Sequence, residues 1–121
     1  MRKIFQSSVL LVGLLGFPPT ALAQVTIKPE DAAKFIGQQK TVCGKVSSTF
    51  FAAKSKGQPT FINLDMWVPN QVRILGSDRS KFEKPPEILY SGKEICVTGM
   101  IQSYQGRPEI IVKEPGQIRA R

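Results

Sequence analysis

The chain has 121 residues, two cysteines, no histidine and a formal net charge of +8. A sequence without histidine lacks the usual general base and the commonest metal ligand, and this one has neither a glycine-rich phosphate loop nor a nucleophile elbow. We therefore expect no enzyme activity, no cofactor and no metal site. The positive charge favours a polyanionic partner, such as nucleic acid, anionic lipid or acidic glycan, although solubility alone would also account for it.

Residues 1–23 have the layout of a secretory signal peptide. A positively charged start is followed by an apolar run over 9–15, and Ala21-Leu22-Ala23 gives the small-x-small pattern of a cleavage site. The run is shorter than the roughly 20 apolar residues that span a bilayer, so a retained anchor is disfavoured. We expect cleavage after Ala23 to leave one domain, residues 24–121, in the periplasm or the medium. Two of the 17 basic residues and none of the nine acidic ones would be lost, giving +6.

A short helix is expected over residues 27–37. A proline lies in its first turn, acidic residues follow at its positive end, and Gly37 closes it. The inner stripe of this helix would consist of three apolar residues: Ala32, Phe35 and Ile36.

Beyond Lys40 the pattern is typical of strands. Five strands are expected, over residues 41–48, 59–65, 72–76, 93–103 and 108–112. Between them we expect an exposed loop at 52–58, a turn region at 66–71 and a turn at 104–107. Residues 77–92 are expected to be irregular, with one helical turn at 78–82 that ends before Pro85-Pro86.

The two cysteines lie in the first and fourth of these strands. Two cysteines in an exported chain of this size are most simply a disulfide, and buried free thiols are the alternative. Alternation places Cys43 and Cys96 on the more polar face of each strand, unless a bulge changes the phase. On one face of paired antiparallel strands they could reach each other. Gly44 and Gly99 would lie on the inner faces, where a bending strand needs room.

The strand motifs follow the order seen in oligonucleotide/oligosaccharide-binding (OB) domains. They occupy residues 40–46, 59–65, 92–99 and 104–112. On these motifs the chain resembles small exported bacterial OB-fold proteins described as nucleic-acid-binding-like. Phe61-Ile62-Asn63-Leu64-Asp65 is also similar to the second strand of tRNA-binding OB domains of aminoacyl-tRNA synthetases, although those are intracellular and serve a catalytic domain. The resemblance implies an all-β, five-stranded Greek-key barrel with a short N-terminal helix, in which the first and fourth strands are neighbours.

OB domains present ligands to the second and third strands and the flanking loops. The resemblance therefore implies a ligand face of nine residues: Phe50, Phe51, Lys54, Lys56, Asn63, Trp67, Arg73, Tyr104 and Arg107. Aromatic platforms combined with cations are the means by which proteins hold single-stranded nucleic acid. In the competing structural interpretation, Phe50 or Phe51 and Phe61 fill the barrel, Trp67 caps one end, and the lysines are solvated loop charges.

Two hypotheses of function follow. In the first, the protein is an exported module that binds single-stranded DNA or RNA through these aromatic and basic residues. In the second, the same face binds an envelope protein or a glycan and has no role with nucleic acid. A minimal nuclease is a distant third, because the acidic residues are scattered.

Overall fold

The strands pair into one seven-stranded sheet in the computed structural model, which describes residues 25–65 and 70–121. The sheet order is β2-β3-β4-β5-β7-β6-β8. The bounds are β2 Thr26–Ile27, β3 Gln39–Phe51, β4 Thr60–Leu64, β5 Asn70–Ile74, β6 Glu94–Tyr104, β7 Arg107–Ile111 and β8 Ile118–Ala120. The protein is therefore mostly β, as expected, but its sheet has seven strands and not five.

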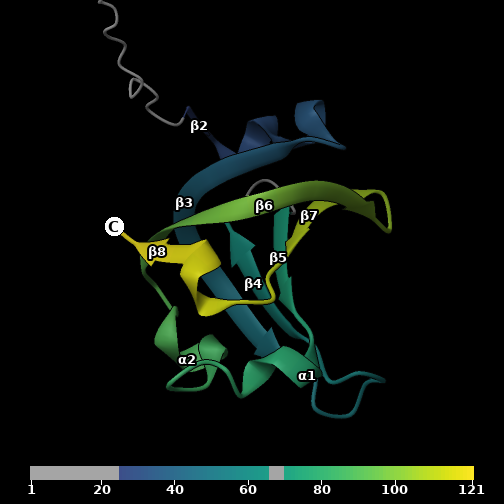
Figure 1. Cartoon of the computed structure of the whole chain (residues 1–121), viewed down its shortest axis with the longest axis vertical. Coiled ribbons are helices and arrows are strands. Elements are labelled where there is room, and N and C mark those ends of the chain that lie inside the picture. Colours follow the sequence, from purple (N-terminus) through teal and green to yellow (C-terminus); the bar gives the residue numbers. More distant parts are fainter. Residues whose placement is uncertain (1–24, 66–69) are drawn as a thin grey trace, which may run out of the picture.

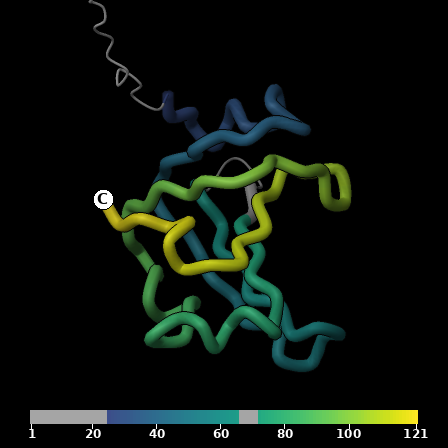
Figure 2. Tube along the Cα trace, in the orientation of Figure 1, coloured from purple at the N-terminus to yellow at the C-terminus, as the bar shows by residue number. Residues whose placement is uncertain are grey.

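The two longest strands, β3 and β6, turn this sheet into a partial ring. The first half of β3 pairs with β6 and its second half with β4, while β6 goes on to pair with β7. Parallel pairing of β5 with β7 joins the two halves. Figures 1 and 2 show β6 and the first part of β3 above β4 and β5, while the second part of β3 bends and runs down beside β4. The expected adjacency of the first and fourth predicted strands is confirmed by the β3–β6 pairing.

The two additional strands lie at the edges of the sheet. β2 pairs in parallel with Thr41 and Val42, and β8 pairs antiparallel with residues 95–97. With two and three residues, they are too short to show an alternating pattern in the sequence. Their existence depends on the neighbouring strand that each one meets.

The expected N-terminal helix is a 3-10 helix, η3, over Pro29–Phe35. Proline starts it and acidic residues occupy its first turn, as predicted. A 3-10 helix has three residues per turn, so Pro29, Ala32 and Phe35 share one face. The first two are buried and Phe35 packs against the core. The prediction that Ile36 faces inward was wrong: it is 44 % exposed, because the helix ends before it.

Residues 77–92 are more regular than expected. Helix α1 covers Gly76–Arg79, and α2 covers Pro86–Leu89. The sequence prediction treated Pro85-Pro86 as a stop, whereas Pro86 occupies the start of α2. Proline is favoured there because the first N–H of a helix has no intrahelical acceptor. Another short helix, η4 at Pro115–Gln117, leads into β8.

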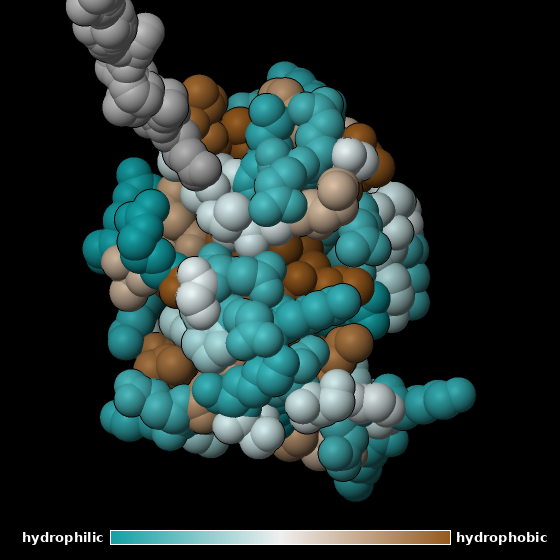
Figure 3. Space-filling view, in the orientation of Figure 1, coloured by the Kyte–Doolittle hydropathy of each residue, from teal (hydrophilic) through white to brown (hydrophobic). Residues whose placement is uncertain are grey.

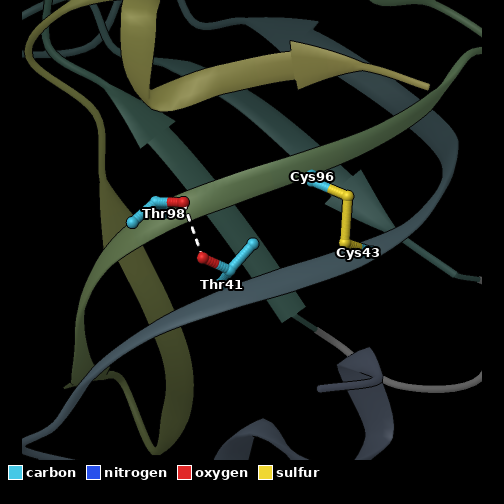
Figure 4. Close-up of a disulfide and its surroundings, with 4 residues drawn as sticks. All are labelled: Thr41, Cys43, Cys96 and Thr98. Carbon is cyan, nitrogen blue, oxygen red and sulfur yellow. Dashed lines mark hydrogen bonds between the residues drawn. A yellow bond between two sulfur atoms is a disulfide. The ribbon is translucent and has the colours of Figure 1, made fainter. Parts of the chain in front are cut away.

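The predicted disulfide joins β3 to β6. Cys43 and Cys96 are direct cross-strand partners, and beside them Thr41 Oγ1 and Thr98 Oγ1 share a 2.7 Å hydrogen bond (Figure 4). Both cysteines are almost completely buried, yet they lie outside the central apolar cluster, to which Val42 and Val97 belong. A disulfide is compatible with an oxidising, extracytoplasmic location.

The core fills the inside of the ring. Among the residues that the structure describes it contains fifteen buried ones, with Ile62, Ile74, Ile95, Val97 and Val112 fully inaccessible. Two glycines allow close packing, as the sequence predicted. A Cβ on Gly44 would lie 2.7 Å from Pro29 Cγ, and one on Gly99 would lie 2.6 Å from Ile110 Cγ2.

The surface in the view of Figure 3 is mainly hydrophilic, with small, separated groups of hydrophobic residues. Among the described residues, no helix has the length and apolar character that crossing a bilayer requires.

Candidate nucleic-acid interface

A β-bulge at Ser47 decides which side chains of β3 face outward. Val46 pairs with Leu64, but Ser48 pairs with the next residue back, Asn63, so Ser47 is the extra residue. Its hydroxyl donates hydrogen bonds to the carbonyl oxygens of Asn63 and Asp65 at 3.2 and 3.1 Å. A bulge shifts the alternation of a strand by one residue. Unbroken alternation from Val46 would turn Phe50 inward, whereas the bulge turns it outward.

Phe50 begins a row of outward side chains across three strands. Phe50 pairs with Phe61 on β4, and Phe61 pairs with Arg73 on β5. Cross-strand partners point to the same side of a sheet. Phe50 is 61 % exposed and Phe61 is partly exposed. We call this side the outer face; its members are Ser48, Phe50, Phe61, Asn63, Arg73, Tyr104, Arg107 and Glu109.

The polar residues of the outer face are ordered by contacts to one another. The Asn63 amide donates a 2.9 Å hydrogen bond to Ser48 Oγ. Arg73 donates to both carboxylate oxygens of Glu109, from Nε at 2.9 Å and from Nη2 at 2.8 Å. Its guanidinium also stacks on Tyr104, 4.2 Å from the ring centroid. These contacts hold the guanidinium against a face of the ring, and we call the pair the Arg73–Tyr104 platform.

Arg73 is therefore a paired cation. Glu109 is 3 % exposed, and its hydrogen bonds are the main reason why the pKa of Arg73 is raised above its ordinary value, against the opposing effect of burial. Arg73 keeps its charge at every physiological pH, but that charge is largely compensated by Glu109. The sequence predicted Arg73 as a ligand cation and gave no sign of its partner.

Phe51 lies on the opposite side of β3 from Phe50. It pairs with the buried Thr60, and the Arg79 guanidinium lies 3.6 Å from its ring centroid. Arg79 also donates to Thr60 Oγ1 at 3.0 Å and forms an ion pair with Glu87. The hydrogen bond from Arg79 lowers the pKa of Glu87. This cluster ties α1 and α2 to β3 and β4, which gives Phe51 a structural role here.

The remaining predicted residues lie around the ends of the outer face. Lys54 and Lys56 are exposed in the β3–β4 loop, which contacts the start of α1 through the 2.9 Å bond from Gly76 N to Gly57 O. Arg107 is exposed and pairs with Tyr104 across the β6–β7 turn. In Figure 1 this turn is at the upper right and the loop at the lower right. Trp67 lies outside the described residues.

Three members of the outer face are not among the residues predicted to bind a ligand: Ser48, Phe61 and Glu109. The competing structural interpretation placed Phe61 in the interior, but it lies outside the apolar cluster. The signal was present in the sequence, since Thr60, Ile62 and Leu64 alternate with Phe61 and Asn63. Glu109 gave no such signal, because its position depends on the parallel β5–β7 pairing.

Neither family models nor curated relatives match the chain. The chain is similar in structure to a putative aspartyl-tRNA synthetase from Leishmania major (TM-score 0.53, 12 % identity). The matched region covers 94 % of this chain and 23 % of the synthetase. Two similar structures are from Entamoeba histolytica. They are its aspartyl-tRNA synthetase (TM-score 0.56, 14 % identity) and its asparaginyl-tRNA synthetase (TM-score 0.53, 20 % identity). These cover 91 % and 81 % of this chain, and 24 % of each synthetase.

The chain thus spans about a quarter of each synthetase. At this level of identity the likeness is one of fold, and it supports the OB-type fold expected from the strand motifs. Within residues 25–65 and 70–121, no group of three or more histidine, cysteine, aspartate or glutamate side chains could hold a metal ion.

Proposed function

We propose that the protein is an exported OB-type module that binds single-stranded nucleic acid across the outer face. The observation that carries this proposal is the pairing of Phe50 with Phe61, which puts two aromatic side chains on the solvent side of the sheet instead of in the core. An exposed phenylalanine on a sheet costs solvation free energy unless something covers it. A nucleobase is a suitable cover, because every base presents a flat π-face.

The neighbouring groups fit the same ligand. The Arg73–Tyr104 platform lies two strands away from Phe50, and strands are about 4.8 Å apart, so the two stacking surfaces are separated by about 10 Å. The Asn63 amide and the Ser48 hydroxyl form the neighbouring row of the same face and offer donors and acceptors to base edges. Arg107 at one end, and Lys54 and Lys56 at the other, would contact the phosphates.

Fluorescence anisotropy with labelled single-stranded oligonucleotides tests the proposal. Phe50→Ala should weaken binding about 5- to 150-fold, since one stacked base contributes about 1–3 kcal/mol. The control is Ile88→Ala, because Ile88 is 66 % exposed on α2, away from the outer face. Affinity should also fall with rising salt, as phosphate contacts release counterions.

One observation favours the second candidate function, a protein or glycan ligand. Arg73 is neutralised by Glu109, so the middle of the outer face offers little net charge to a phosphate backbone. If wild type shows no salt-dependent oligonucleotide binding, the nucleic-acid proposal fails. Capture of an envelope glycan or protein that Phe50→Ala abolishes and Ile88→Ala leaves intact would then identify the outer face as the site of that other partner.

A further inference from the structure

A second group of exposed cations lies on a different surface from the outer face. Four adjacent strands, β2, β3, β6 and β8, share an outward side around the disulfide. Thr41 and both cysteines in the middle of this side are buried, whereas the charged residues around them are exposed. Strand pairing shows which residues of this side are neighbours. In one row across the strands, Arg119 lies beside Cys96, which lies beside Cys43. In the next row Lys45 pairs with Glu94, whose carbonyl oxygen accepts a 2.9 Å hydrogen bond from the backbone N–H of Arg121.

We call this side the basic wall. Lys28 follows β2 in extended backbone, and alternation places it on the same side as Thr26. The wall therefore carries Lys28, Lys45, Arg119 and Arg121 against a single acid, Glu94. All four cations are exposed, and none takes part in an ion pair within the part of the chain that the structure describes.

We propose that the basic wall binds a membrane surface rich in anionic phospholipid. Its shape favours that partner over a nucleic-acid strand. The wall spans four strands, so it is about 14 Å wide, and it is built from paired strands rather than from loops around a groove. Among its outward residues there is no aromatic platform for bases in the described chain; the pairs beside the cations are the disulfide and Thr41–Thr98 (Figure 4).

A further observation points to lipid. Met100 continues the outward side of β6 beyond Thr98 and is 45 % exposed, which adds an apolar side chain at the end of that side farthest from Glu94. Cations together with exposed apolar side chains are typical of proteins that lie on a bilayer.

Sedimentation with vesicles tests the proposal. The full chain is expressed with its own leader, and the N-terminus of the purified product is read by mass spectrometry. Wild type should bind vesicles of phosphatidylglycerol and phosphatidylcholine, but not vesicles of phosphatidylcholine alone. A cation near an anionic membrane raises partitioning about 5-fold, so the double variant Arg119→Glu/Arg121→Glu should bind at least about 25-fold more weakly.

The matched control is Lys84→Glu/Lys113→Glu. It changes the net charge by the same amount at exposed lysines outside the wall, so it should lose much less binding. Equal losses in both double variants would mean that only net charge matters, and would overturn the proposal. So would a failure of wild type to prefer anionic vesicles.

The same variants separate this proposal from the outer face. Oligonucleotide affinity should be equal for the two double variants, and Phe50→Ala should leave vesicle binding unchanged. If the wall variant instead loses oligonucleotide affinity relative to its control, the wall is a nucleic-acid surface and the lipid proposal is wrong.

Discussion

Loss of the Cys43–Cys96 disulfide is expected to lower the free energy of unfolding by about 4 kcal/mol. The bond closes a loop with a sequence separation of 53, and the chain-entropy relation gives about 4 kcal/mol for a loop of that length. The perturbation is the double variant Cys43→Ala/Cys96→Ala. For a domain of this size, each kcal/mol shifts Tm by about 4–8 °C, so we expect a decrease of roughly 15–30 °C.

Loss of the disulfide should also change the denaturant m-value, which gives a second, independent test. If the disulfide stabilises mainly by restricting the unfolded chain, its removal makes that chain more extended and raises the denaturant m-value. The assay is urea unfolding followed by circular dichroism, with and without reductant. Reductant should convert wild type to the behaviour of the double variant and leave the variant unchanged.

The control removes a neighbouring contact without opening a loop. Thr41→Val/Thr98→Val deletes the adjacent 2.7 Å hydrogen bond from the same two strands. Since both partners become apolar, its effect should be about 1 kcal/mol or less, with an unchanged m-value. The entropic argument is refuted if the cysteine variant loses no more stability than this control, or if its m-value stays at that of wild type.

Two further predictions concern the packing of side chains against the sheet. Glu87→Gln should destabilise the protein by about 1 kcal/mol at pH 7, because it weakens the partly buried pair with Arg79. The pKa of Glu87 is lowered in the folded state, so the stability it provides is present above its ordinary pKa and disappears as the pH falls through the lowered value. Thermal unfolding from pH 7 to pH 2 should therefore show the two proteins converging, and a constant gap would contradict this. Gly99→Ala should cost about 1–3 kcal/mol in urea unfolding, since its Cβ would overlap Ile110, whereas Gly116→Ala, with open space around it, should be close to neutral. Equal effects of the two substitutions would disprove the close-approach argument.

Much of the fold is visible in local sequence patterns. The five longer strands were all expected, within a few residues of their bounds. The turn at Gln105-Gly106 was also expected, and both residues have positive φ, as a two-residue hairpin turn requires. These features depend on residues that are neighbours in the chain, so the sequence carries the information directly.

Other features depend on partners that are distant in sequence. β2 and β8 exist only through pairing with β3 and β6, and the Arg73–Glu109 pair only through the parallel β5–β7 contact. Likewise, the basic residues of the wall are spread from Lys28 to Arg121, and sheet pairing alone brings them together. No local pattern in the sequence reports such contacts.

The sequence by itself determined the β-rich class, the export signal as a prediction, and the pairing of the only two cysteines across neighbouring strands. The tertiary structure decided which aromatic side chain faces solvent. Alternation alone would turn Phe50 inward, and the opposite occurs because Ser47 is an extra residue opposite β4. A bulge costs one unpaired residue and reverses every side chain that follows it in the strand. Its position depends on the partner strand, so only the folded sheet could place Phe50 on the outer face beside Phe61.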